Sequence, residues 1–344
     1  MKHAILSLLD LLLSTSAFAV PEANFQIVND LFANRDHFFS NATFTGVDHF
    51  KISYTKYGSD VGARGCMVLV PGQAEAAMKY LEVAYDLHQA GFSPIYTIDN
   101  RGQGASQRPL PDPQMNSVNN FSDYADDLET MVNTVVLKDP ACQGHKLSLL
   151  AHSMGGAIAA VYLEKVGANS PFRKAAVTSP MFRIIYPAPR TEDSVITETF
   201  FACNTPFGPK CDGYAPGQGP YNPNSVFDDN LYTHSQVRFG FKKAIFAQWP
   251  NLILGGPTVR WVRQAAIADR DMRKPENAKR IAASLLVFQA ENDKIVDNSG
   301  QNEFCAAMGR NCQIIKVQGS NHESLMESDS IRDYVMANIV SFFD

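Results

Sequence analysis

The hydrophobic and polar positions change their spacing several times along the chain, and these changes predict alternating strands and helices. Residues 50–57 alternate as in a half-buried strand, whereas residues 66–70 are continuously apolar, as in a central strand covered on both faces. From 76 to 90 the apolar side chains recur at helical spacing and end at Gly91. Further strands are predicted at 95–98, 146–150, 174–177, 285–288 and 313–317, and further helices at 123–137, 157–166, 300–308 and up to Phe343. This order predicts an α/β protein with a mostly parallel central sheet flanked by helices.

The alternation is interrupted between residues 180 and 271, where proline, glycine and aromatic residues are frequent. An insertion between consecutive strands would lie over the carboxyl edge of the sheet. We therefore expect a core formed by 20–179 and 272–344, with 180–271 as an inserted cap whose aromatic residues contact substrate. The alternative is a packing subdomain without a ligand role, because buried aromatic residues are common.

Length and composition are typical of a globular protein. The chain has 344 residues, of which 45% are hydrophobic and 19% charged, enough to bury the core of one large domain or two smaller ones. Its formal charge of −5 gives no basic face for phosphate backbones, so we expect no nucleic-acid partner.

Residues 1–19 have the pattern of a secretory signal peptide. Lys2 precedes an apolar stretch, and Ala17-Phe18-Ala19 forms a small-x-small cleavage pattern before Val20. The stretch is too short for a membrane span, and no other stretch is long and apolar enough for one. We expect an exported protein, periplasmic or secreted. The alternative is an N-terminal anchor that stays attached.

A candidate nucleophile lies where a predicted strand meets a predicted helix. The segment KLSLLAHSMGGAIAAV, from Lys146, places Ser153 between small residues, with Ala151 at the first glycine position of a G-x-S-x-G pattern. A strand that turns directly into a helix crowds its backbone, so small neighbours leave room and the serine hydroxyl is exposed. The alternative is a serine that only caps a buried helix.

An acid and a histidine follow two later strands. Asp293 comes after the strand at 285–288, and His322 after the strand at 313–317. Parallel strands end at one edge of a sheet, so we expect Ser153, Asp293 and His322 to meet there as nucleophile, orienting acid and base. Asp297 is a competing acid. Arg101 is expected to brace its loop by ion pairing. The remaining charged neighbours and histidines are expected to be surface, cap or packing residues: Glu291, Glu323, His88, His145, His152 and His234.

Five segments in order, PGQAEAAMKY, DNRGQGAS, AHSMGG, AENDKIV and GSNHE, resemble the motifs of bacterial lysophospholipases and monoacylglycerol lipases. These are α/β-hydrolases of the serine aminopeptidase S33 type, and the resemblance covers roughly residues 44 to 344 apart from the cap. It implies an oxyanion hole of the backbone N–H groups of Gln73 and Met154, and neither metal nor cofactor. Pro71 and Asn100 stand where the family usually has histidine.

The resemblance and the motifs together predict an exported serine ester hydrolase. The expected substrate is a lysophospholipid or monoacylglycerol met at a membrane surface. A peptidase of the proline-iminopeptidase kind remains an alternative, with cap acids binding a substrate amine: Glu192, Asp193 and Glu198. An acyltransferase would use the same triad with water kept out of the second step. A non-catalytic binding module would be expected to lack one of the three triad residues.

The cysteines predict disulfides, which can be tested chemically and are typical of an exported protein. All six lie beyond the signal segment, at 66, 142, 203, 211, 305 and 312. Pairing Cys203 with Cys211 and Cys305 with Cys312 closes short loops and leaves Cys66 with Cys142, although six cysteines allow fifteen pairings. We expect alkylation of the unreduced, denatured protein to label no thiol, and mass spectrometry of the alkylated protein measures this. Labelling of all six would contradict both the disulfides and export, and would indicate reduced thiols in a cytosolic protein.

Overall fold

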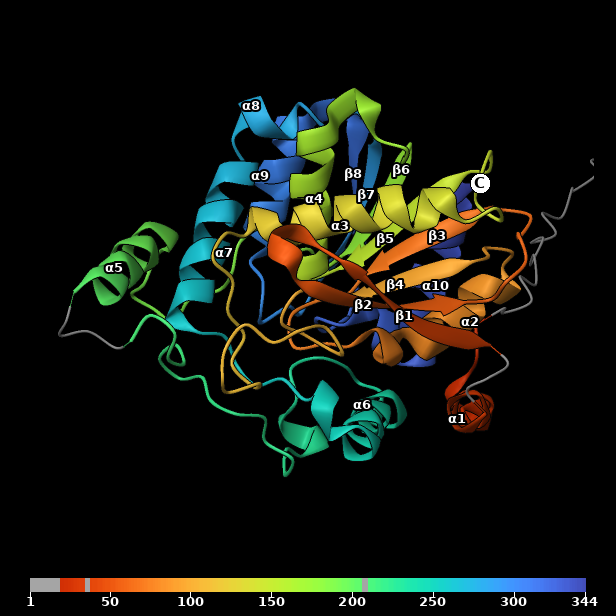
Figure 1. Cartoon of the computed structure of the whole chain (residues 1–344), viewed down its shortest axis with the longest axis horizontal. Helices are drawn as coiled ribbons and strands as arrows, with labels where there is room; N and C mark the ends of the chain where they lie inside the picture. The colour runs from red at the N-terminus through yellow and green to blue at the C-terminus, as the bar shows by residue number, and fades with distance from the viewer. Residues whose placement is uncertain (1–18, 35–37, 206–209) are drawn as a thin grey trace, which may run out of the picture.

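A computed structural model describes residues 19–34, 38–205 and 210–344 and contains one central sheet (Figure 1). The strand order is β1-β2-β4-β3-β5-β6-β7-β8. The pairs β1·β2 and β2·β4 are antiparallel, and all other pairs are parallel. The strands are β1 (Phe39–Thr45), β2 (Lys51–Tyr57), β3 (Cys66–Val70), β4 (Ile95–Asp99), β5 (Leu147–His152), β6 (Lys174–Thr178), β7 (Ser284–Ala290) and β8 (Cys312–Val317).

Helices cover both faces of this sheet (Figure 1). One apolar cluster joins the sheet to α3, α4, α7 and α9, and the other joins it to α1, α2 and α10. These two buried layers position the strand ends where the candidate site lies. The helices are α1 (Gln26–Ala33), α2 (Leu81–Gln89), α3 (Ser122–Thr134), α4 (Met154–Val166), α5 (Glu192–Asn204), α6 (Gln236–Gln248), α7 (Val259–Met272), α8 (Pro275–Ala278), α9 (Asn298–Met308) and α10 (Asp329–Phe343).

The structure confirms the predicted α/β fold and its mostly parallel sheet. Every strand and helix predicted from hydrophobic spacing is present, although several ends differ by a few residues. Sequence analysis missed β1, α1 and α8, and it predicted none of the helices α5, α6 and α7 within 180–271. In β1 only Phe39 is buried, so this edge strand lacks the alternation that identifies a half-buried strand. In α1 only Val28 is buried, because the helix lies at the periphery.

Residues 180–271, predicted as a cap, divide between two environments. Helix α5 stands out at the left of the molecule, whereas α6 lies along its lower edge and buries Phe241, Ile245 and Phe246 in the core cluster that contains α2 and α10 (Figure 1). Helix α7 instead returns to the core, where Trp261, Ala265 and Met272 are buried against the layer that contains α4. The last helix of the predicted range therefore packs as part of the core.

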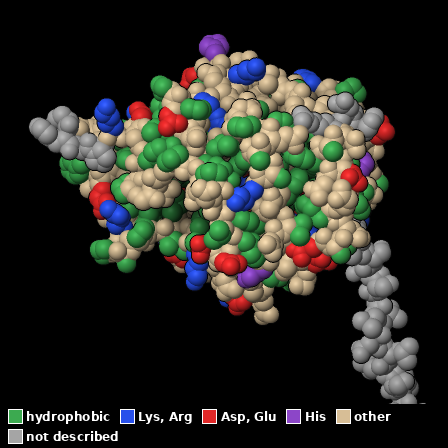
Figure 2. All heavy atoms as spheres, turned by 90° about the horizontal axis from the view of Figure 1, so that it is seen from below, with side chains coloured by type: hydrophobic (Ala, Val, Ile, Leu, Met, Phe, Trp, Pro, Cys, Tyr) green, Lys and Arg blue, Asp and Glu red, His purple; other side chains and the backbone are tan. Residues whose placement is uncertain are grey.

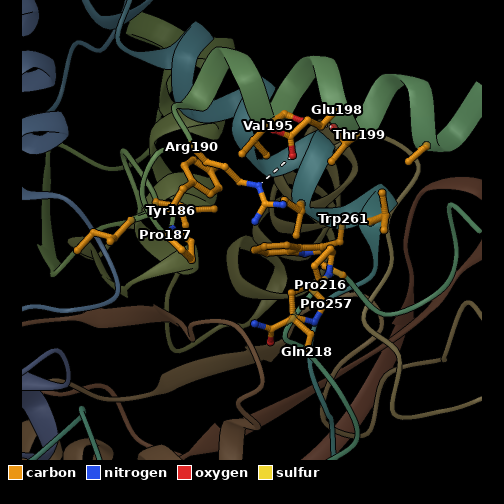
Figure 3. A pocket seen from close by; sticks show the side chains of 16 residues that line it. Tyr186, Pro187, Arg190, Val195, Glu198, Thr199, Pro216, Gln218, Pro257 and Trp261 are labelled. Carbon is orange, nitrogen blue, oxygen red and sulfur yellow. Dashed lines mark hydrogen bonds and ion pairs between the residues drawn. The ribbon is translucent and has the colours of Figure 1, made fainter. Parts of the chain in front are cut away.

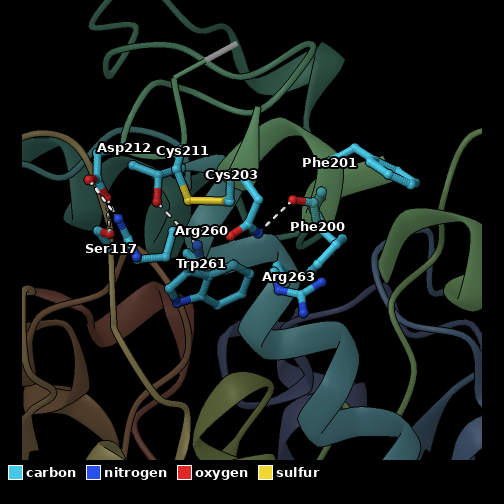
Figure 4. Close-up of a disulfide and its surroundings, with 12 residues drawn as sticks. Ser117, Phe200, Phe201, Cys203, Cys211, Asp212, Arg260, Trp261 and Arg263 are labelled. Carbon is cyan, nitrogen blue, oxygen red and sulfur yellow. Dashed lines mark hydrogen bonds and ion pairs between the residues drawn. A yellow bond between two sulfur atoms is a disulfide. The ribbon is translucent and has the colours of Figure 1, made fainter. Parts of the chain in front are cut away.

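Three disulfides join the cysteines in the pairing that the sequence favours. They link Cys66 to Cys142, Cys203 to Cys211 and Cys305 to Cys312. Figure 4 shows the second one, which connects the end of α5 to the segment that leads toward α6. Beside it, Arg260 at the start of α7 forms an ion pair with Asp212 at 2.7 Å. The projecting helix α5 is thus fastened to the base of the cap at its C-terminal end.

The predicted signal segment, 1–19, lies outside the described residues except for Ala19, which is buried. The adjacent Val20 is also buried, and its N–H donates to the Asp86 carboxylate at 2.9 Å. Among the described residues, no helix has the length and apolar character that a membrane crossing requires.

A buried arginine joins α6 to the core and to the start of the described chain. The Arg238 guanidinium donates to Glu82 at 3.0 Å, to Asp329 at 2.9 Å, and to the carbonyl oxygen of Val20 at 3.0 Å. Its side chain has no exposed surface. Removing one member of a buried ion-pair cluster leaves uncompensated charge in a low-dielectric interior.

We therefore expect Arg238→Met to lower the free energy of unfolding by about 3–5 kcal/mol, because Glu82 would lose the closer of its two buried arginine partners. Urea denaturation followed by circular dichroism measures this change. Arg310→Met is the control, since Arg310 is exposed. Equal stability of the two variants would contradict an anchoring role for Arg238.

Candidate active site

The candidate nucleophile lies in a strained turn between β5 and α4. Ser153 has φ 52° and ψ −121°, a left-handed backbone conformation that residues other than glycine rarely adopt. The following residues must be small: a Cβ atom on Gly155 would lie 2.1 Å from the carbonyl oxygen of Val70, and one on Gly156 would lie 2.6 Å from Pro180. The turn therefore directs the serine side chain beyond the end of the sheet.

The structure brings the three residues predicted from strand ends into one hydrogen-bonded chain. His322 Nε2 lies 2.9 Å from Ser153 Oγ, and His322 Nδ1 lies 2.8 Å from Asp293 Oδ2. All three residues are buried, with Asp293 9% exposed. This geometry suits proton transfer from the serine to the imidazole, with the carboxylate holding the ring in one orientation.

Asp293, and not Asp297, contacts the histidine. Burial acts to raise the pKa of Asp293, but the His322 hydrogen bond and two backbone N–H donors, of Ile295 and Val296, hold it below the usual value. The acid is therefore a carboxylate at neutral pH. Asp297 instead accepts from the N–H of Ser299 at 2.8 Å, as the N-cap of α9.

The loop after β3 carries the expected oxyanion donor. The N–H of Gly72 donates to Glu75, and the N–H of Ala74 donates to Gln103 at 2.7 Å. Within the described residues, the intervening N–H of Gln73 has no such partner. The N–H of Met154 lies in the first turn of α4, where helical N–H groups lack intrahelical acceptors. Both groups are thus available to a developing oxyanion.

The loop after β4 holds the oxyanion loop in place. Asn100 donates to the carbonyl oxygen of Pro71 at 2.8 Å, and Gln103 both donates to Gly72 at 3.1 Å and accepts from Ala74. Arg101 braces the loop after β4, as the sequence predicts, because its guanidinium donates two hydrogen bonds to the Asp127 carboxylate, at 2.8 and 2.9 Å. Asn100, at a position where the family usually has histidine, therefore has a positioning contact.

A buried cluster of charges beside the serine was not predicted from the sequence. Lys79 pairs with both Glu75 and Glu323, and Tyr80 donates to Glu75 at 2.6 Å. The expectation of a solvated Glu323 is wrong, because its carboxylate is 2.7 Å from Lys79 in the interior. Burial acts to raise the pKa of Glu75, but the charge of Lys79 holds it well below the usual range. Both carboxylates are therefore charged.

His152, next to the nucleophile, is a buried neutral imidazole. Burial lowers its pKa to about 4, in spite of attraction to Glu75. Its Nδ1 atom lies 3.0 Å from the Thr178 hydroxyl oxygen. Glu75, His152 and Glu323 converge as metal ligands could, but the Lys79 ammonium already bridges the two carboxylates. This arrangement fits an internal ion pair rather than a bound cation.

Two larger cavities are lined mainly by residues of the range 180–271, and the second of them shares lining residues with a small space at Ser153. The first, of about 430 Å³, is mainly apolar and lies under α5, with Tyr186, Val195 and Trp261 in its wall (Figure 3). Ile185 lines it and donates its N–H to the Ile295 carbonyl oxygen at 3.0 Å, while Ile295 lines the space above the serine. The second cavity, of about 560 Å³, lies beside α6 and is more polar; its aromatic lining residues are Tyr221, Tyr232, Phe239 and Phe246.

Known proteins resemble this chain in sequence and in fold. A family model described as serine aminopeptidase, S33 matches residues 62–329. Lysophospholipase L2 of Escherichia coli (strain K12) is 34% identical over 323 residues, covering 92% of this chain and 90% of that protein. Probable lysophospholipase L2 of Haemophilus influenzae is 31% identical over 302 residues, covering 87% and 90%. A soluble variant of monoglyceride lipase from Saccharomyces cerevisiae, solved with a substrate analog, has a similar fold, with a TM-score of 0.68 at 17% identity, covering 89% of this chain and 94% of that one.

The contacts of Gln103 predict a loss of turnover without a comparable loss of binding. In Gln103→Leu the oxyanion loop loses two tethers, and we expect kcat for a p-nitrophenyl ester to fall about 10- to 100-fold while KM changes little. Gln107→Leu is the matched control, because Gln107 is exposed and, among the described residues, its side chain bonds only to the N–H of Lys51. Equal kinetics in the two variants would show that the tether is dispensable.

Proposed function

The chain belongs to the serine aminopeptidase S33 family of α/β-hydrolases, and from this premise we propose that it releases a fatty acid from a lysophospholipid or monoacylglycerol through a Ser-His-Asp acyl-enzyme mechanism. The chain of hydrogen bonds from Ser153 through His322 to Asp293 carries the proposal. As its relatives indicate, the protein is a serine ester hydrolase. The identity of the ester and the role of each residue are what the proposal adds.

The proposed reaction has two steps. Ser153 Oγ attacks the ester carbonyl carbon while His322 Nε2 accepts its proton, and the N–H groups of Gln73 and Met154 bind the oxyanion. The C–O bond to the alcohol then breaks, and His322 returns the proton to that alcohol. Water next attacks the acyl-enzyme with His322 again as base, which releases the fatty acid and restores the serine. Asp293 remains ionised and stabilises the imidazolium.

The apolar cavity under α5 suits the acyl chain. Its wall is formed largely by aliphatic and aromatic side chains (Figure 3). One of its lining residues, Ile185, bonds to Ile295, which lines the small space at the serine. Each buried methylene would contribute about 0.8 kcal/mol to binding. Tyr186 and Trp261 are the aromatic residues of the insertion that would contact the chain in this cavity.

The cap exposes apolar side chains that suit a lipid surface. Phe201 is 57% exposed and Val226 is 55% exposed, and Figure 2 shows hydrophobic side chains spread over the face that carries α6. We propose that this face meets the membrane that holds the substrate. Export to the periplasm or medium, with cleavage after Ala19, belongs to the same proposal and is supported by the three disulfides.

The alternative peptidase function is less well supported. The cap acids that could bind a substrate amine already have arginine partners: Glu192 lies 2.6 Å from Arg273, and Glu198 lies 2.9 Å from Arg190. Asp193 is 3.7 Å from Arg270 and points to solvent. An amine would have to displace these guanidinium groups. An acyltransferase would use the same residues and is distinguished by its product.

Product analysis by mass spectrometry tests the proposal. The protein from Val20 onward is incubated with lysophosphatidylcholine, monoacylglycerol, p-nitrophenyl esters and aminoacyl amides. We expect free fatty acid from the lipids, and a loss of about 10⁴-fold or more in Ser153→Ala and His322→Ala, because each removes the nucleophile or its base. His234→Ala is the control, since His234 lies in the 180–271 range and its imidazole is bonded to Glu327.

Activity near wild type in Ser153→Ala would overturn the assignment of the nucleophile. Loss of activity in His234→Ala alone would move the base into the cap. Amine release without fatty acid would indicate a peptidase, and an acylated glycerol product would indicate transfer to an alcohol.

A further inference from the structure

One lysine lies between the candidate nucleophile and the more polar cap cavity. Lys242, on α6, lines the small space that also contains Ser153 and His322, and it lines the cavity of about 560 Å³ beside α6. Any ligand that extends from the serine into this cavity passes the Lys242 side chain. The residue has no place in the acyl-transfer steps described above.

The ammonium group of Lys242 has no carboxylate within ion-pair distance among the described residues. Its Nζ atom instead lies 5.7 Å from the ring centre of Tyr232 and 5.9 Å from that of Phe246. The nearest buried carboxylates, Glu75 and Glu323, bind Lys79. Burial and repulsion from Lys79 lower the pKa of Lys242, although Glu323 and Glu75 oppose this effect. An anion would therefore stabilise the charged form.

A second donor in the same passage also lacks a partner. The side-chain Nε2 atom of Gln73 is buried and makes no hydrogen bond within the described part of the chain. Gln73 lines both the space above the serine and the cavity beside α6. Buried donors are normally hydrogen-bonded, so an unpartnered amide beside an unpaired ammonium indicates a place for acceptor oxygens.

We propose that Lys242, assisted by the Gln73 amide, binds the phosphate of a lysophospholipid head group while Ser153 attacks the acyl ester. This inference rests on the proposed function and narrows its substrate class to phosphate-bearing lysolipids over monoacylglycerols. In such a lipid only the glycerol carbons separate the scissile ester oxygen from the phosphate. The acyl chain occupies the cavity under α5, and the head group occupies the cavity beside α6.

The neighbouring lysine provides a matched control. Lys243 also lines the cavity beside α6, but its ammonium donates to the carbonyl oxygen of Ser225 at 2.8 Å. It does not line the space above Ser153. Lys242→Met and Lys243→Met therefore remove the same charge from adjacent positions of one helix, and only the first removes it from the passage to the serine.

The test compares kcat/KM for lysophosphatidylglycerol and monoacylglycerol of the same acyl chain, in the same mixed micelles. We expect the ratio of the two values to fall about 10- to 100-fold in Lys242→Met, as for loss of a charged hydrogen bond, and to fall much less in Lys243→Met, whose ammonium already has an acceptor in Ser225. Lys242→Arg should retain most of the preference, because it keeps the charge. If Lys242→Met does not fold, a wild-type ratio in Lys242→Gln would overturn the inference equally well.

Other outcomes separate this inference from the proposed function. If wild type hydrolyses both lipids and Lys242→Met leaves their ratio unchanged, the head-group assignment is wrong and the esterase proposal stands. If wild type hydrolyses neither lipid, the proposed function itself is wrong. Inorganic phosphate is the second probe: if it inhibits hydrolysis of both lipids through Lys242 while the ratio is unchanged, the lysine binds a free ion and not a head group.

Discussion

The turn at Ser153 is the constraint on which the rest of the site depends. A left-handed backbone at a residue with a side chain costs about 1–3 kcal/mol, so the surroundings must hold it. They do so from both sides, because the Ser153 N–H donates to the Thr178 carbonyl oxygen and the Ser153 carbonyl oxygen accepts from Met181. Gly155 then lets α4 approach the end of β3. The central strands, the helix and the candidate nucleophile are consequently parts of one packed unit.

The sequence predicted this unit because its determinants are local. Continuous apolar runs identify buried strands, small residues around Ser153 identify the turn, and parallel strands bring Asp293 and His322 to the same edge. The charge cluster beside Ser153 could not be predicted in this way. Lys79 and Glu323 are far apart in the sequence and look like ordinary surface charges until the fold buries them together. Edge strand β1 was missed for the related reason that almost none of its side chains is buried.

The cap combines two environments that no sequence pattern distinguished. Both parts are rich in aromatic residues, yet one forms an apolar cavity under α5 and the other a more polar cavity beside α6. The difference depends on which side chains of irregular segments turn inward, and that is set by tertiary contacts. It matters chemically, because an amphiphilic ester also has one apolar and one polar end. The shape of the cap thus contains information about the substrate that its composition does not.

The ion pairs of Arg238 affect the entropy that a ligand of Lys242 would lose on binding. Arg238 and Lys242 are four residues apart on α6 and therefore share one face of the helix. Ion pairs to Glu82 and Asp329 fix the first residue against the core, so the backbone that carries the second is ordered before any ligand arrives. Immobilising a flexible side chain on binding commonly costs about 0.5–1.5 kcal/mol, with more for a mobile loop. Here the ordering of the backbone takes place during folding, which leaves only the lysine side chain to be ordered by the ligand.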